Sequence, residues 1–121
     1  MPEHNTVLDE SILNSIKKLL GITPENTVFD DVIALHINTA LADIVSMGVG
    51  PKNGYAIASS ENNWSEFLGN EKPELIQNAK TLVYIKVRLM FDPPQNSAVI
   101  EAFNARAKEI EYRIYTEKGG F

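Results

Sequence analysis

The stretch from Pro73 to Phe91 constrains the fold more than any other part of the chain. In a helical conformation its apolar residues cover nearly the whole circumference: Leu75, Ile76, Ala79, Leu82, Val83, Ile85, Val87, Leu89 and Met90. A helix that is apolar nearly all round is buried and packed on several sides. Proline suits the first position of a helix, and this one would be about 28 Å long. The sequence therefore predicts a long central helix at 73–91.

Asp92, Pro93 and Pro94 end this helix, because a residue before proline leaves the helical region and two prolines cannot continue it. A second long helix is expected over residues 96–117, beginning at 96 or 97. Its apolar stripe is narrow: Val99, Ile100, Phe103, Ala107, Ile110 and Ile114. We therefore expect Asp92, Pro93 and Pro94 to act as a structural hinge, a rigid corner between a buried helix and a one-sided one.

The first helix is expected at residues 9–20. Its apolar side chains recur with helical spacing: Ile12, Leu13, Ile16, Leu19 and Leu20. Asp9 or Ser11 can cap its start, and Lys17 and Lys18 complement the helix dipole at its end. A second amphipathic helix is expected at 30–47, with Gly48 as its stop.

The segment "NWSEFLG" predicts a short third helix, with Trp64, Phe67 and Leu68 on one face. Trp64 is either a core anchor or an exposed interface residue, and the sequence favours the core. The predicted fold class is therefore all-α: a five-helix bundle whose third helix is short and whose fourth is central. Residues 1–121 are expected to form a single helical domain, with 1–8 and 116–121 as flexible or docking termini.

The segment 48–63 between the second and third helices is expected to be a long loop or a small β-hairpin. Its turn signals are Gly48, Gly50, Pro51 and the Asn53-Gly54 pair. A loop this long in a small domain is usually functional or mobile. The run "GVGPKNG" superficially resembles a phosphate-binding loop, but it lacks the Gly-Lys-Ser/Thr ending and follows a helix, so we reject that interpretation.

Composition limits the classes of function. The chain has 121 residues, 16 acidic and 11 basic side chains, and a net charge of −5. Tight nucleic-acid binding is disfavoured, because it needs clustered Lys and Arg. The absence of cysteine excludes disulfides and thiolate metal sites. The N-terminal residues do not form a signal-peptide pattern, and the longest apolar run, at 82–91, is too short to span a bilayer. A soluble protein of a reducing compartment, or of a particle assembled in one, is expected.

Catalytic and metal-binding patterns are missing from the sequence. The two histidines are His4, near the N-terminus, and His36, at the edge of an apolar helix face. Neither belongs to a metal-ligand spacing or a nucleophile motif, and His36 is interpreted as structural. Glu109 and Glu111 do not share a helix face and are interpreted as solvated surface. We expect no catalytic residue, no cofactor and no metal.

Several polar or aromatic residues lie at positions that the packing of a single subunit does not explain. Lys86 lies inside the apolar sector of the 73–91 helix, so it either snorkels to water or pairs with a carboxylate within or between subunits. Arg88 belongs to a polar strip that is either solvated or a contact face. Tyr112 and Tyr115 leave the apolar stripe of the last helix and belong either to a docking segment or to a frayed end. The candidate interface residues are Lys52, Asn53, Tyr55, Lys86, Arg88, Tyr112, Tyr115 and Phe121.

Four fragments, in this order, resemble the small head–tail connector (adaptor) proteins of tailed bacteriophages and prophages. They are "SILNSIKKLLGI", "HINTALADIVSMGVGP", "NWSEFL" and "LVYIKVRLMFDPPQNSAVIEAFNARAKEIEYRI", and they span residues 11–114. The most specific parts are "KVRLMFDPP" and the "GVGP" turn before a Trp-containing helix. The resemblance implies an all-helical structural virion protein without catalytic residues, made in the bacterial host cytoplasm and located at the head–tail junction.

The resemblance also implies partners. Such subunits form a ring of about twelve copies beneath the portal protein. The ring extends the DNA channel and carries the tail, through a tail-side stopper or tail-completion protein. DNA passes through the lumen without sequence-specific binding, and no membrane is involved. Two alternatives stay open: a small phage-derived helical regulatory or nucleic-acid-binding module, which would need a basic recognition face, and an enzyme of unrecognised type.

Overall fold

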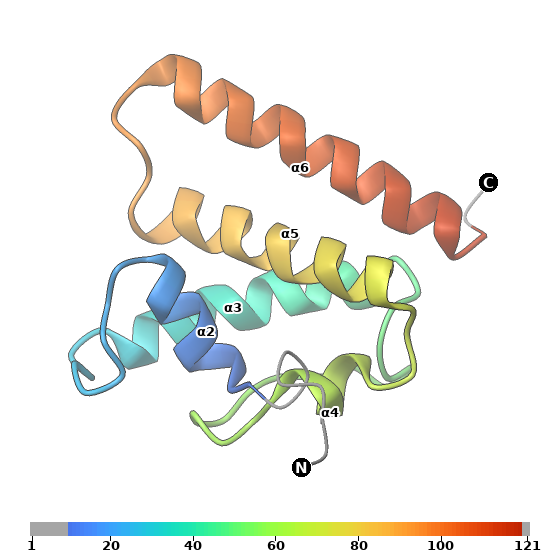
Figure 1. The fold of residues 1–121 in the computed structure, drawn as a ribbon, viewed down its shortest axis with the longest axis horizontal. Helices are drawn as coiled ribbons and strands as arrows, with labels where there is room; N and C mark the ends of the chain where they lie inside the picture. Colours follow the sequence, from blue (N-terminus) through green and yellow to red (C-terminus); the bar gives the residue numbers. More distant parts are fainter. Residues whose placement is uncertain (1–9, 120–121) are drawn as a thin grey trace, which may run out of the picture.

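The computed structural model describes residues 10–119, which fold into five helices (Figure 1). They are α2 (Ile12–Leu19), α3 (Asp30–Val45), α4 (Trp64–Leu68), α5 (Pro73–Phe91) and α6 (Ser97–Glu117). No strand forms in this range; Ser11 and Asn63 make an isolated antiparallel bridge. The all-α, five-helix prediction is confirmed. None of the described helices is both long and apolar enough to cross a membrane.

Helix α5 is the centre of the bundle, as its all-round apolarity predicts. It packs against α2 and α3 on one side and against α6 on the other (Figure 1). Its buried residues come from most of its circumference: Leu75, Ile76, Ala79, Leu82, Val83, Ile85 and Val87. The other two residues of the predicted apolar set lie near the end of α5: Leu89 is partly buried, and Met90 is 41% exposed.

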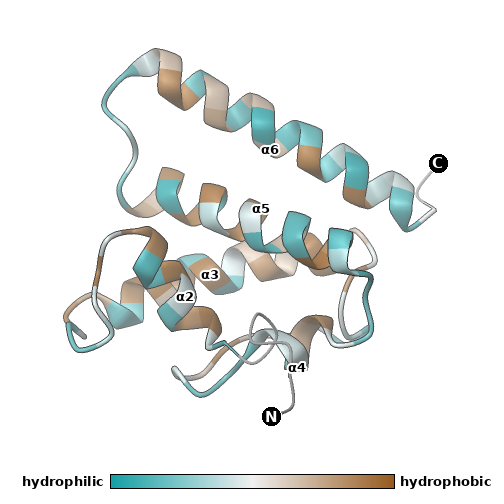
Figure 2. Cartoon of the chain, viewed as in Figure 1, coloured by the Kyte–Doolittle hydropathy of each residue, from teal (hydrophilic) through white to brown (hydrophobic). Residues whose placement is uncertain are grey.

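Helix α6 packs on α5 through a narrow stripe, also as predicted. Its buried residues are Ala107, at its midpoint, and Ile110 and Ile114, in its second half, whereas Val99 near its start is 39% exposed. The first half makes a lighter contact, in which the Phe103 ring lies 6.3 Å from the ring of Tyr84. Figure 2 shows apolar residues on the side of α6 that faces α5 and hydrophilic residues over much of the rest. Most of the surface of α6 is thus available for other contacts.

Two helix boundaries differ from the predicted ones because of local capping. Helix α2 begins at Ile12, since the Ser11 hydroxyl accepts a hydrogen bond from the Asn14 amide at 3.1 Å. Helix α3 ends at Val45, two residues earlier than predicted. Gly48, with a φ of 94°, then turns the chain away in a conformation that favours glycine.

The segment 48–63 is a loop, so the hairpin alternative is not adopted. A type I′ hairpin turn needs positive φ at both central residues, and Asn53 does not have it. Instead Gly54 donates a backbone hydrogen bond to the Pro51 carbonyl. The Asn38 side chain on α3 satisfies both backbone groups of Ile57, accepting from its amide at 2.7 Å and donating to its carbonyl at 3.1 Å. The loop is thus tied to the bundle by a side chain rather than by a neighbouring strand.

Candidate functional site

A groove between the C-terminal ends of α3 and α6 brings three candidate interface residues together. Lys86, Tyr112 and Tyr115 all line it, although the sequence places them on two different helices. Its volume is about 400 Å³, and its other lining residues are Asp43, Ser46, Met47 and Glu111. This groove is the strongest grouping of predicted site residues in the structure.

Lys86, on α5, lines this groove and links three helices. Its Nζ lies 3.3 Å from Asp43 Oδ2 on α3 and 3.0 Å from Glu111 Oε2 on α6. Partial burial lowers the pKa of Lys86, but the pairs with Glu111 and Asp43 raise it, and the balance leaves that pKa above its usual value. Lys86 therefore stays charged at neutral pH. Of the alternatives in the sequence, the ion pair within the subunit is the one adopted.

The two tyrosines give the groove an aromatic wall. Tyr112 is 63% exposed and Tyr115 is 39% exposed, and the partly buried Met47 adds apolar surface to the same groove. Two carboxylates around one ammonium make the groove slightly acidic. Aromatic rings beside charged groups are typical of protein–protein contact surfaces. The groove therefore suits contact with another protein, and the interface role of its residues stays a prediction.

Arg88 lies two residues after Lys86, in the last turn of α5, where it closes the corner. Its Nε donates to the Asp92 carbonyl at 2.5 Å, and its Nη1 donates to the Tyr84 hydroxyl at 3.2 Å. The Phe91 ring meets the Phe29 ring edge-on at 5.4 Å on the same corner. Arg88 thus satisfies a carbonyl that the helix end leaves open. A role for Arg88 in subunit contacts remains a prediction.

Replacing Pro93 and Pro94 by Ala should loosen this corner. Both substitutions widen the conformations open to the unfolded chain, and together they should lower the free energy of unfolding by about 1–2 kcal/mol. Helical content by circular dichroism should stay nearly unchanged, since both residues lie between helices. Assembly should be impaired because the angle between α5 and α6 is no longer held. A double variant that assembles as efficiently as a Pro51→Ala control would contradict the hinge.

The three candidate interface residues of the 48–63 loop differ in their exposure to solvent. Lys52 and Asn53 are exposed at its tip. Tyr55 instead turns inward, where its ring stacks on Phe67 at 5.3 Å and its hydroxyl donates to Glu66 Oε1 at 2.5 Å. Burial and the contact with Glu66 raise the pKa of Tyr55 well above its usual range. Tyr55 therefore anchors the loop, whereas Lys52 and Asn53 at its tip are open to a partner.

Trp64 is a core residue, as the sequence favoured. The alternative interpretation, an exposed interface residue, is wrong. The side chain is fully buried, and its Nε1 donates to the Ser15 hydroxyl at 2.9 Å. Lys80 Nζ lies 5.5 Å from the ring centre, within cation–π range.

Of the two histidines, His36 is half-buried on α3. His4 and Phe121 lie outside the described residues.

The structure contains one buried charge that the sequence analysis missed. Lys17 is 0% exposed, and its Nζ lies 2.7 Å from Asp30 Oδ1 and 3.2 Å from the Pro24 carbonyl. It was expected only to complement the dipole of α2. Its position four residues after the buried Leu13 is the signal that could have revealed it. Lys17 holds the connector between α2 and α3 against the bundle.

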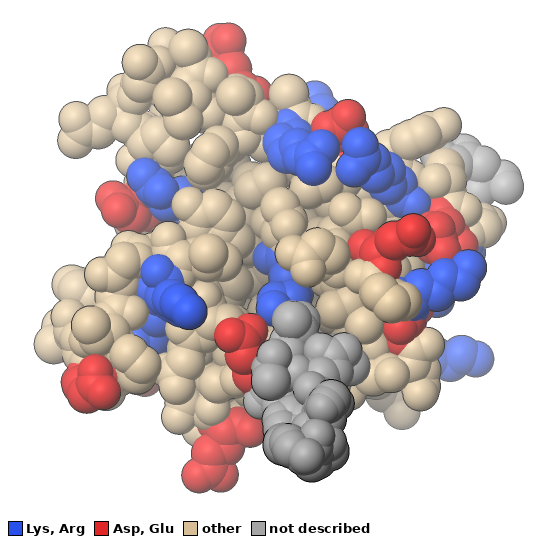
Figure 3. Space-filling view, in the orientation of Figure 1, with Lys and Arg blue, Asp and Glu red and all other residues tan. Residues whose placement is uncertain are grey.

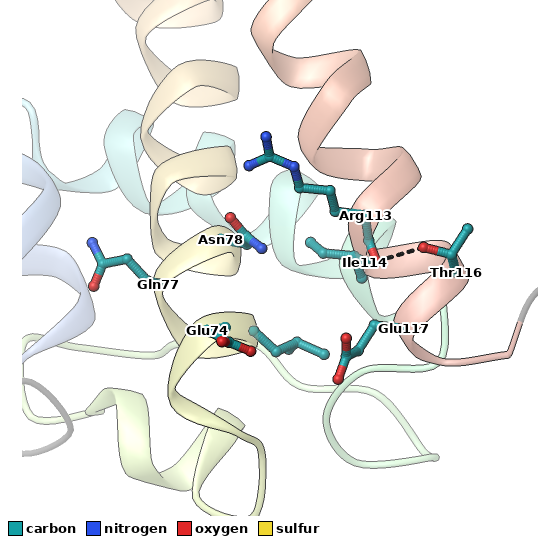
Figure 4. Close-up of a pocket in the computed structure, with 8 residues that line it drawn as sticks. Glu74, Gln77, Asn78, Arg113, Ile114, Thr116 and Glu117 are labelled. Atoms are coloured by element: carbon teal, nitrogen blue, oxygen red, sulfur yellow. Dashed lines mark hydrogen bonds between the residues drawn. The ribbon is translucent and has the colours of Figure 1, made fainter.

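A second groove lies between α5 and α6 and has a volume of about 510 Å³ (Figure 4). Its walls are Glu74, Gln77 and Asn78 on α5 and Arg113, Thr116 and Glu117 on α6, with Leu75 and Ile114 between them. This mixture of charges and amides suits polar contacts.

Within residues 10–119, no group of three His, Cys, Asp or Glu side chains is placed to hold a metal ion. Beyond the grooves, Lys118 Nζ holds Glu71 Oε1 at 3.1 Å, which ties the end of α6 to the start of α5.

A small helical bundle with surface grooves lined by aromatic, charged and amide side chains suits a structural protein that works by assembly. The family model for phage connector proteins matches residues 12–120. The chain therefore belongs to the phage connector protein family, and its resemblance to head–tail connectors is confirmed. It is a structural phage protein with a connector role, associated with portal and tail proteins in the virion. No curated protein and no solved structure matches the chain.

Proposed function

We propose that the chain is the repeating subunit of a ring between the portal protein and the tail. The ring, of about twelve copies, would extend the DNA channel and form the platform on which a tail-side stopper or tail-completion protein docks. The observation that carries this proposal is the connector-family match over residues 12–120, almost the whole chain. The single-domain organisation of residues 1–121 is part of the same proposal.

Charge supports a channel through which DNA slides. The chain has a net charge of −5, and an acidic wall does not retain a polyanion. Its exposed basic side chains on α6 are partly neutralised, since Arg106 and Arg113 both pair with Glu109, at 2.6 and 3.5 Å. DNA would therefore pass without sequence-specific binding, and a nucleic-acid-binding module is the weaker alternative.

The candidate contact regions lie at separate places on the subunit. The loop tip with Lys52 and Asn53 is one, and the Lys86 groove with Tyr112 and Tyr115 is another. A ring needs heterologous contacts, in which one patch meets a different patch of the neighbour, so separate regions fit this role. We assign the loop tip and the C-terminal residues, including Phe121, to the portal and tail partners.

Inactivation of the gene in the phage or prophage that encodes this protein tests the proposed function. A stop codon early in the gene should leave DNA-filled heads and separate tails, and a plasmid copy should restore complete infectious particles. Electron microscopy and plaque counts measure both outcomes. Purified protein mixed with its portal protein should also form a ring on the portal. Infectious particles produced at normal efficiency without the protein would overturn the proposal.

A further inference from the structure

The start of α3 and the turn before it carry exposed apolar side chains. Val28, in the turn, is 80% exposed, and Phe29 is 44% exposed. Val32 and Leu35 are 38% and 62% exposed and lie about one turn apart on the outer side of α3. Together these four residues are called the α3 patch below. Exposed apolar side chains that gather in one place are typical of contact sites.

The α3 patch is held in place by the bundle. The Phe29 ring meets the Phe91 ring at the end of α5. Asp30, the next residue, pairs with the buried Lys17, whose Nζ also donates to the Pro24 carbonyl. These contacts fix the connector between α2 and α3. A surface that is ordered in advance binds a partner at a lower cost in conformational entropy.

The same part of the chain is acidic. Residues 19–51 contain four carboxylates and no Lys or Arg. Glu25 and Asp31 are exposed, and neither makes an ion pair within residues 10–119. Asp92, which directly follows Phe91, is a third exposed carboxylate of this kind. Carboxylates therefore lie on both sides of the contact between the two phenylalanine rings.

Basic side chains near the α3 patch do not cancel these charges. Lys17 is used by Asp30, and Arg88 adds one positive charge at the corner, against three exposed carboxylates. Lys18 lines the grooves beside α2, together with Glu10. Figure 3 shows mainly uncharged side chains over the connector and the start of α3, at the lower left, and several Lys and Arg side chains along α6. The α3 patch is thus apolar with a negative rim.

We propose that the α3 patch is the docking site for a basic amphipathic helix of a different protein. This inference rests on the proposed function, in which the subunit contacts other virion proteins. The apolar side of that helix covers Val32 and Leu35, whose spacing matches one turn of a partner helix. Its Lys and Arg side chains reach Glu25 and Asp31, and such rim pairs give orientation and speed of association.

Charge also argues against a second copy of this chain as the occupant. The chain has a net charge of −5, so it has no surplus of basic side chains to offer to an acidic surface. Arg106 and Arg113 on α6 already pair with Glu109. A partner with an excess of Lys and Arg beside apolar anchors satisfies the α3 patch better.

A synthetic peptide tests this chemistry without any virion protein. The probe is a fluorescent amphipathic helix of Leu and Lys, about four turns long, and fluorescence anisotropy measures its binding to the full chain. The same peptide with Glu in place of Lys should not bind. Val32→Ser/Leu35→Ser should weaken binding of the Lys peptide about tenfold or more. The matched control Leu19→Ser/Val99→Ser removes side chains of similar exposure elsewhere and should change it less than about twofold.

The charged rim has its own pair of variants. Glu25→Lys/Asp31→Lys should weaken binding of the Lys peptide and flatten its dependence on salt, since the screened attraction is lost. Glu61→Lys/Glu101→Lys changes the net charge equally at exposed positions elsewhere and should keep both the affinity and the salt dependence. Equal losses in the patch and control variants, equal binding of the Glu peptide, or no binding of the Lys peptide would each defeat the inference.

The same variants are then mixed with purified portal protein and tail-completion protein. Val32→Ser/Leu35→Ser should lose binding to one of them, whereas Leu19→Ser/Val99→Ser should bind both. Normal binding of the patch variant to both proteins counts against the inference. So does light scattering that shows self-association of the wild type but not of the patch variant, because the occupant is then a second copy. If the Lys peptide binds at the α3 patch but the wild type binds neither virion protein, only the proposed function fails.

Discussion

Trp64→Ala should lower the free energy of unfolding by about 3–5 kcal/mol, as truncation of a large core side chain does. The indole is fully buried between α4 and the rest of the bundle, and its loss leaves a cavity. It also leaves the Ser15 hydroxyl without the donor that it now accepts from. Denaturant unfolding followed by circular dichroism measures the change. Helix α4 should lose its order first, because Trp64 supplies much of its buried surface.

Two control variants sharpen this result. Trp64→Phe keeps most of the apolar surface but not the N–H group, so it should cost clearly less than the Ala variant. Leu35→Ala removes a large apolar side chain that is 62% exposed, and it should change stability by about 0.5 kcal/mol or less. If Trp64→Ala unfolds at the same denaturant concentration as Leu35→Ala, the indole does not hold α4 in place.

Asp30→Ala should lower the free energy of unfolding by about 3 kcal/mol, because it leaves the buried Lys17 ammonium without its carboxylate. The Pro24 carbonyl still accepts a hydrogen bond from Lys17 Nζ, but it carries no full negative charge. Part of the Asp30 side chain is exposed, so water can reach the site and the loss stays at the lower end of the usual range. Unfolding in urea at neutral pH measures it.

The neighbouring Asp31→Ala is the matched control, since Asp31 is exposed and should change stability by about 0.5 kcal/mol or less. The double variant Lys17→Met/Asp30→Ala removes both charges and keeps a long side chain in place. It should be more stable than Asp30→Ala alone, because no charge is then buried without a partner. A double variant that is no more stable than Asp30→Ala would contradict this account.

The sequence by itself determined the helical class, the central position of α5 and the corner after it. These features follow from local rules. The all-round apolar pattern over 73–91 can be satisfied only by burial, and Pro93 and Pro94 end a helix whatever surrounds them. The order of motifs was also enough to recognise the connector family. The narrow stripe of α6 predicted a helix attached along one side, and the structure has that arrangement.

Only the tertiary structure decided which polar residues are internal. The sequence assigned Lys17 only to the dipole of its helix and left open whether Lys86 snorkels or pairs. In the structure Lys17 pairs with Asp30 on the next helix, and Lys86 pairs with Asp43 and Glu111 on two other helices. The Asn53-Gly54 pair favours a hairpin locally, but Asn38, from α3, takes the backbone partners that a second strand would have used. The sequence also did not reveal that Val32 and Leu35, on the outer side of α3, are exposed. A helix with apolar residues on two sides does not reveal which side the rest of the chain covers, because burial depends on neighbours that local sequence does not specify.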